Sequence, residues 1–173
     1  MDLTGGMLRA MDRLSAPRVA EAHCDIPCGI YDPHAAQIAA HTVIRMFQLI
    51  QNLEKPADNA GKEQIDTYLQ SFGRYVAVKE EHAKIVEHEI IILWTDYFKP
   101  EHLEKVPNLH DLVWKTTKLT STVKQQINKQ AALDLLAGIQ QIAEIFWETK
   151  GVKTKRGPSG QPSGGETVYP IQG

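Results

Sequence analysis

The sequence has little cysteine, with only two among its 173 residues, at positions 24 and 28. A small secreted domain held together by disulfides would contain more. There is no excess of basic charge either, because 19 Lys and Arg are balanced by 21 Asp and Glu. There is also no apolar run long enough to cross a bilayer. We therefore expect a globular protein of one domain, with no nucleic-acid and no membrane partner.

Residues 1–22 lack the unbroken apolar stretch of a secretory signal, because charged residues interrupt every candidate run. They end in Ala20-Glu21-Ala22, a small-x-small pattern that resembles a peptidase site. We interpret residues 1–22 as a leader that another protease removes. With no export signal, the expected location is the cytoplasm, where thiols stay reduced.

Four later segments have the apolar periodicity of amphipathic helices. The spacing predicts helices over 33–54, 64–97 (with a break near 71–73), 108–123 and 128–150. Asp32 and Asn128 are suitable N-caps, and residues 101–107 are expected to be a polar connection. Four long helices with short links indicate an all-α fold, an antiparallel four-helix bundle. Gly, Pro and Ser dominate residues 151–173, which we expect to form a flexible tail.

A bundle of this kind first suggests a di-iron carboxylate protein, which requires Glu-x-x-His pairs. None of the bundle's histidines has a Glu three positions earlier, so this class is excluded by spacing. His34 and His41 lie two helical turns apart. Such histidines are more often solvated or hydrogen-bonded in a core than bound to a metal.

The short segment HCDIPCGIYDP, residues 23–33, is different. It places His23, Cys24 and Cys28 within six residues, and its prolines and glycine exclude a regular helix. Two thiolates favour a soft or borderline metal. Structural zinc usually takes four side-chain ligands, and only three are present here. By spacing alone, a local disulfide or a pair of inert thiols is as good an interpretation as a metal site.

Residues 23–33 resemble, throughout, the N-terminal metal-binding hook of the nickel superoxide dismutase family. LWTDYFKP (93–100) and FWETK (146–150) resemble two further segments of that family, so the resemblance covers residues 23–150. It implies one nickel ion per subunit and a homohexamer. It also implies disproportionation of superoxide to hydrogen peroxide and dioxygen by Ni(III)/Ni(II) cycling.

The resemblance further implies five nickel donors. They are the amine and imidazole of His23, the backbone nitrogen and thiolate of Cys24, and the thiolate of Cys28. A deprotonated amide and thiolates donate charge and stabilise Ni(III), and square-planar coordination suits Ni(II). The nitrogen of His23 is an amine only after cleavage between Ala22 and His23. We therefore expect a maturation protease as a partner and little activity in the unprocessed chain.

By the same resemblance, Tyr31 is the catalytic residue that stands over the metal and restricts access to small anions. The surrounding residues would be Asp25, Pro27, which fixes the turn, and Tyr97 and Lys99, which lie near the approach channel.

The chain also departs from the family's pattern. Ala39 and His82 stand where the family has the Glu and Arg that orient the axial imidazole, and the region 57–73 is longer. His82 is either a substitute partner, for example across a subunit interface, or an ordinary helical residue.

Two other functions remain open at this stage. One is a non-catalytic nickel- or copper-binding protein, because the same donors would bind copper. The other is a redox sensor in which Cys24 and Cys28 cycle between dithiol and disulfide.

Overall fold

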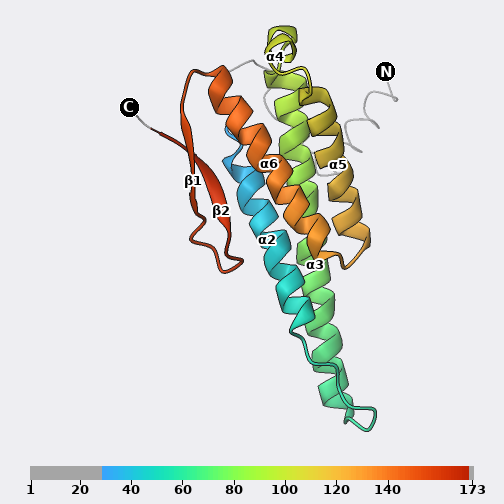
Figure 1. Ribbon diagram of the computed structural model, residues 1–173. Coiled ribbons are helices and arrows are strands. Elements are labelled where there is room, and N and C mark those ends of the chain that lie inside the picture. The colour runs from blue at the N-terminus through green and yellow to red at the C-terminus, as the bar shows by residue number, and fades with distance from the viewer. Residues whose placement is uncertain (1–28, 172–173) are drawn as a thin grey trace, which may run out of the picture.

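The computed structural model describes residues 29–171. Four long helices form the bundle, and a short π-helix, a short α-helix and a β-hairpin complete the fold (Figure 1). In chain order the elements are α2 (His34–Gln51), α3 (Lys62–Ile92), η1 (Leu93–Tyr97), α4 (Pro100–Lys105), α5 (Leu109–Gln125), α6 (Lys129–Thr149), β1 (Thr154–Pro158) and β2 (Glu166–Pro170). The predicted helical bundle is confirmed.

The core lies along the bundle axis, where the apolar face of each helix meets the others. Its largest fully buried side chains include Phe47, Ile90, Leu109, Ile139 and Phe146. Burial of side chains of this size contributes about 1.5–3 kcal/mol each. None of the described helices is both long enough and apolar enough to span a membrane.

Both predicted N-caps make a capping contact. The carboxylate of Asp32 accepts a hydrogen bond from the backbone N–H of His34 at 2.8 Å, and the side chain of Asn128 accepts one from Ala131 at 3.0 Å. The expected break near 71–73 is wrong, since α3 runs through it without interruption. Gly73 is tolerated there because a single glycine weakens a helix by only about 1 kcal/mol.

The connection expected at 101–107 contains a helix instead, because α4 begins at Pro100. Proline is well suited to the first position of a helix, where its missing N–H leaves no hydrogen bond unmade. The backbone N–H of Lys99 donates to Nδ1 of His102 at 3.2 Å, which closes the first turn.

A buried lysine marks the end of the bundle. Lys79 on α3 is 2% exposed, and its ammonium donates to the carbonyls of Val123 and Lys124 at the end of α5, at 2.6 and 2.9 Å. It also lies 5.4 Å from the ring centre of Phe47. Burial lowers the pKa of Lys79. The part of α3 before this residue extends past α5 as an arm, visible at the bottom of Figure 1.

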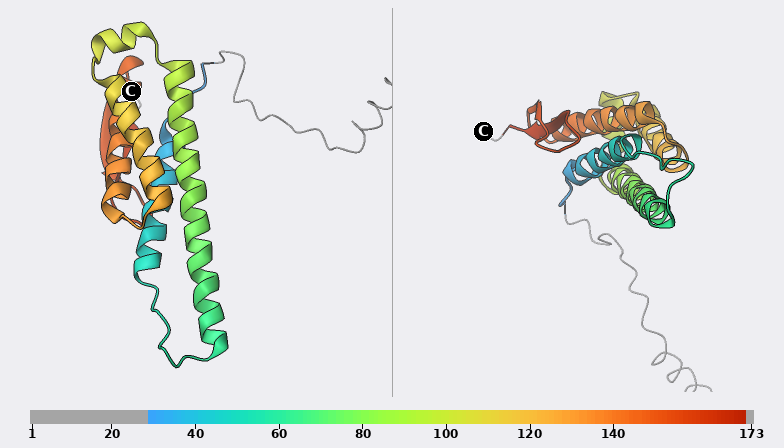
Figure 2. Two further views of the ribbon diagram at one scale, coloured as in Figure 1. Left: turned by 90° about the vertical axis from the view of Figure 1, so that its right-hand side faces the viewer. Right: turned by 90° about the horizontal axis from the view of Figure 1, so that it is seen from below.

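The prediction of a flexible tail after residue 150 is wrong for the described part. β1 and β2 pair as an antiparallel hairpin, with Thr154 opposite Pro170 and Pro158 opposite Glu166. Seen from below, the hairpin lies beside α2 and α6, away from α3 and α5 (Figure 2). Thr167 and Val168 are buried there, 0% and 1% exposed.

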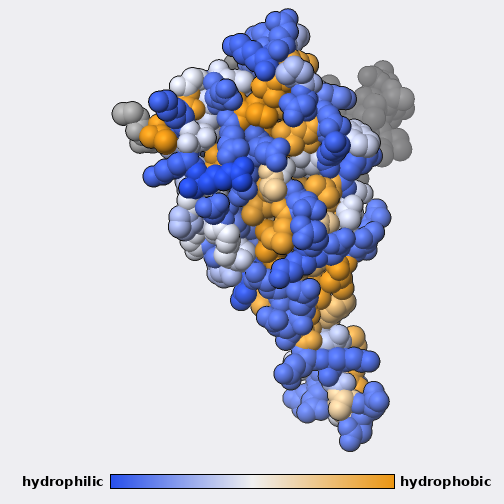
Figure 3. All heavy atoms as spheres, viewed as in Figure 1, coloured by the Kyte–Doolittle hydropathy of each residue, from blue (hydrophilic) through white to orange (hydrophobic). Residues whose placement is uncertain are grey.

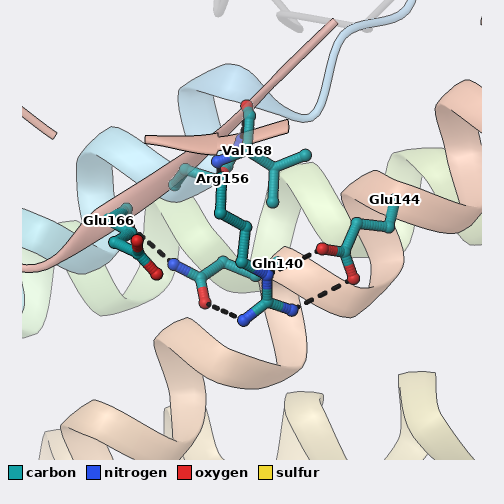
Figure 4. A network of polar contacts seen from close by, with 6 residues as sticks. Gln140, Glu144, Arg156, Glu166 and Val168 are labelled. Carbon is teal, nitrogen blue, oxygen red and sulfur yellow. Dashed lines mark hydrogen bonds and ion pairs between the residues drawn. The ribbon is translucent and has the colours of Figure 1, made fainter. Parts of the chain in front are cut away.

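Polar side chains of the helices hold the hairpin, which explains why its composition did not reveal it. The guanidinium of Arg156 donates to both carboxylate oxygens of Glu144, at 2.7 and 3.0 Å. Gln140 accepts from Arg156 at 3.2 Å and donates to the carbonyl of Glu166 at 2.6 Å (Figure 4). Contacts of this kind do not require a regular spacing of apolar residues, and that spacing is the main signal from which secondary structure is predicted.

Candidate functional site

The predicted ligands His23, Cys24 and Cys28 lie outside the described residues, as do Ala22, Asp25 and Pro27. Within residues 29–171 no group of three or more His, Cys, Asp or Glu side chains could hold a metal ion. The structure therefore describes the hook only from Gly29 onward.

Tyr31, the predicted catalytic residue, comes together with two of the predicted surrounding residues, Tyr97 and Lys99. The rings of Tyr31 and Tyr97 lie 5.5 Å apart, tilted by 56°. Together with Lys99 they line a pocket of about 340 Å³, whose other lining residues are Gly29, Asp96, Glu101 and His102. Gly29 has φ of 74°, a left-handed conformation that a side chain would disfavour.

Tyr97 owes its position to the π-helix η1. The backbone N–H of Phe98 donates to the carbonyl of Leu93, five residues earlier, at 2.9 Å. One wider turn of this kind changes the direction of the side chains that follow, and such turns are frequent at functional sites. Tyr97 thereby packs against Phe146 of α6, with ring centres 4.6 Å apart. No pattern in the sequence signals the π-helix.

Three further residues hold the Tyr97 ring, and sequence reasoning missed all of them as site residues. The hydroxyl of Tyr97 lies 2.6 Å from that of Thr149. The imidazole of His102 stacks on the ring at 5.5 Å and 21°. The ammonium of Lys150 lies 5.6 Å from the ring centre. The FWETK segment, which contains Thr149 and Lys150, was a signal, because it was recognised as family-like but assigned no role.

The pocket carries charges of both signs. Lys99 stands among its lining residues with Asp96 and Glu101, and all three are exposed. Lys99 offers a small anion a local point of attraction, but the two carboxylates make the charge of the lining negative overall.

His82 lies apart from this pocket. It is on α3, fifteen residues before Tyr97 along a continuous helical segment, so roughly 20 Å separate the two at 1.5 Å per residue. Its Nδ1 donates to the carbonyl of Val78 at 2.9 Å. Ala39 is 3% exposed, within the core. The structure does not bring His82 to the Tyr31–Tyr97 pocket of the same chain.

The other two histidines that we considered are consistent with the expected structural roles. His41 is buried at 2% exposure, and its ring contacts Ser163, the carbonyl of Glu166 and Thr167 at 2.9–3.2 Å. Burial lowers its pKa. His34 is exposed and lies near the ring of Tyr169 on the hairpin.

Comparison with known proteins connects this arrangement to a family. The family model described as nickel-containing superoxide dismutase matches residues 18–150. A "Superoxide dismutase [Ni]" of Streptomyces coelicolor is 43% identical over 141 residues, which are 81% of this chain and 98% of the relative. The same enzyme of Streptomyces seoulensis is 42% identical over the same shares of the two chains.

Solved structures agree with the sequence relatives. A native structure of nickel superoxide dismutase is similar with a TM-score of 0.64 and 37% identity, over 75% of this chain and 99% of that one. An apo structure of the enzyme gives 0.61 and 35%, over 71% and 99%. The hairpin lies beyond the part that the family model matches. Residues 18–150 carry the family's sequence pattern, the described part of this range forms a similar bundle, and the chain belongs to the nickel-containing superoxide dismutase family.

Proposed function

We propose that this chain disproportionates superoxide to hydrogen peroxide and dioxygen at one nickel ion, held by the hook that begins at His23. The observation that carries the proposal is the pocket between Tyr31 and Tyr97, which opens directly after the last predicted ligand, Cys28. The matched family and the named relatives support the activity.

The donor set of the hook fits nickel. His23, Cys24 and Cys28 provide an imidazole, two thiolates, a backbone nitrogen and a terminal amine. Soft sulfur with nitrogen in a planar arrangement suits Ni(II). When bound, the metal supplies the one-electron oxidation and reduction that dismutation requires.

The described residues would control access to the hook. The tilted rings of Tyr31 and Tyr97 narrow the approach, so a small anion passes while larger molecules are excluded. Lys99 would attract a negatively charged substrate locally within this lining, an effect that salt would weaken.

Maturation would switch the site on. Before cleavage, the nitrogen of His23 is an amide bonded to Ala22 and lacks the basic lone pair of an amine. We expect a maturation protease to cut between these residues, and the chain to act in the cytoplasm.

The test compares chains that differ only at the N-terminus. A chain beginning at His23 and a matched control beginning at Ala22 are each loaded with nickel, and superoxide decay is followed by pulse radiolysis. We expect activity only in the His23 chain, because the control has its amine one residue away. Equal activity of the two chains would contradict the role of the amine, and the absence of activity from both would contradict the proposed function itself.

We also propose that the chain assembles as a homohexamer. Large apolar side chains remain exposed on three helices, namely Ile91 (45%), Trp114 (54%) and Leu133 (39%), and Ile127 (53%) is exposed in the connection between α5 and α6. Apolar surface runs along the middle of the face in Figure 3, bordered by hydrophilic side chains. Exposed patches of this kind commonly mark protein interfaces. Native mass spectrometry of the processed protein gives the number of subunits directly.

The same assembly would give His82 a role. Because its Nδ1 proton is donated to Val78, its Nε2 presents a lone pair. This acceptor would replace the family's Glu, absent at Ala39, in orienting the imidazole of His23. The distance from the pocket of its own chain favours a contact with the hook of a neighbouring subunit.

A further inference from the structure

The hydrogen bond between Tyr97 and Thr149 has a direction that the neighbouring contact fixes. The Thr149 hydroxyl lies 2.6 Å from the carbonyl oxygen of Phe146 and 2.6 Å from the Tyr97 hydroxyl. A carbonyl only accepts, and a threonine hydroxyl has a single proton. Thr149 therefore donates to Phe146, and the proton between the two hydroxyls belongs to Tyr97.

The direction of this bond decides what Tyr97 offers to the pocket. Its phenol proton points toward the C-terminal turn of α6. Phe146 at 4.6 Å and His102 at 5.5 Å contact the ring, so the ring cannot turn without losing these contacts. Tyr97 therefore lines the pocket without donating its phenol proton into it.

We propose that Thr149 is a positioning residue, which sets the orientation of Tyr97 so that this tyrosine acts as a wall of the pocket and not as the proton donor for peroxide. The inference rests on the proposed function, because it concerns protons that dismutation consumes. Two protons and two superoxide ions give one hydrogen peroxide and one dioxygen. The proposal requires that both protons reach the peroxide by a route other than Tyr97.

The experiment uses the processed, nickel-loaded protein and four variants: Thr149→Val, Thr149→Ser, Tyr97→Phe, and the double variant Thr149→Val with Tyr97→Phe. Thr67→Val is the matched control, because the Thr67 hydroxyl makes the same kind of contact to its own helix, with Glu63, but lies on the arm. Pulse radiolysis gives kcat and KM across pH and in heavy water. Nickel content and the unfolding midpoint are measured for each variant.

Thr149→Val and Tyr97→Phe each remove the same hydrogen bond. We expect each to lower kcat/KM by about fivefold, which corresponds to a neutral bond of about 1 kcal/mol. The double variant should lose no more than either single variant, and Thr149→Ser and Thr67→Val should behave like the wild type. Tyr97→Phe should keep the wild-type pH profile and solvent isotope effect.

Two results would overturn the proposal. One is a Tyr97→Phe variant that loses a limb of the pH profile or its solvent isotope effect, because Tyr97 would then be the proton donor. The other is additive losses in the double variant. If the wild type itself shows no activity, the proposed function fails, but the positioning claim is still testable. Resonance Raman spectra of wild type minus Tyr97→Phe should show a phenol that donates a hydrogen bond, and this signature should disappear in Thr149→Val.

Discussion

Gln37 should contribute strongly to the docking of the hairpin on α2. Its side chain is completely buried. It accepts a hydrogen bond from the backbone N–H of Val168 at 2.8 Å and donates one to the carbonyl of the same residue at 3.2 Å. One amide thus pairs with β2 as a neighbouring strand would.

The loss of stability expected for Gln37→Ala follows from the two backbone groups that this substitution leaves without a hydrogen-bond partner. Val168 is 1% exposed, so its N–H and carbonyl would both stay buried without a partner. Each such group costs about 1–3 kcal/mol, which makes about 2–6 kcal/mol for the pair. This loss has an upper limit, because the hairpin would detach from α2 once the cost of the two unpaired groups exceeds the free energy with which the hairpin binds the helices.

Two measurements separate these outcomes. Urea unfolding followed by circular dichroism gives the global free energy of unfolding, and amide hydrogen exchange at Val168 gives the local free energy of opening. Gln141→Ala is the matched control, because Gln141 is an exposed residue of α6. The reasoning would be refuted if Gln37→Ala stayed within about 0.5 kcal/mol of the wild type and left exchange at Val168 unchanged.

Two further predictions concern stability. Burial lowers the pKa of His41, with a further contribution from nearby His34, so this histidine takes up a proton more readily in the unfolded chain than in the folded one. Its contribution to the free energy of unfolding should therefore be intact above about pH 6.5 and decrease below that pH, by at most about 1.4 kcal/mol per pH unit. Unfolding free energies measured against pH should show that His41→Gln removes this slope, and an unchanged slope would contradict the assignment. Gly138→Ala would place a Cβ atom 2.4 Å from the hydroxyl oxygen of buried Thr116, so we expect a loss of about 1–3 kcal/mol. Adding Thr116→Ala should recover most of that loss in the same urea titration, and no recovery would mean that the clash is elsewhere.

The bundle was predictable because its helices depend on local signals. Apolar residues recur at helical spacing, and Asp32 and Asn128 cap the helices that they precede. The errors arose where a local signal was weak. Gly73 did not interrupt α3, and Pro100 began a helix in a stretch that appeared to be a polar connection.

The hairpin was not predictable by the same reasoning. Its strand β1 has the sequence TKRGP, with no apolar alternation. The residues that hold it include Gln37, His41 and Gln140, which are between 16 and 131 residues away in sequence from their partners on the hairpin. The sequence signal for the hairpin is a polar side chain at an inward-facing position of a helix, and this signal can be interpreted only once its partner on the hairpin is known.

The site divides in a similar way, and the division follows from chemistry. Metal ligands must be particular residue types at close spacing, so the hook of His23, Cys24 and Cys28 was legible in the sequence. The wall of the pocket depends on shape, and many residue types could provide it. Tyr97 reaches Tyr31 because a π-helix redirects it and Thr149 on another helix accepts a hydrogen bond from its hydroxyl. If Thr149 positions Tyr97 as we infer, the FWETK segment contributes to the activity as well as to the packing of the bundle. A relative that lacks a hydroxyl at this position should then hold its tyrosine by another acceptor, or show the lower kcat/KM expected of Thr149→Val.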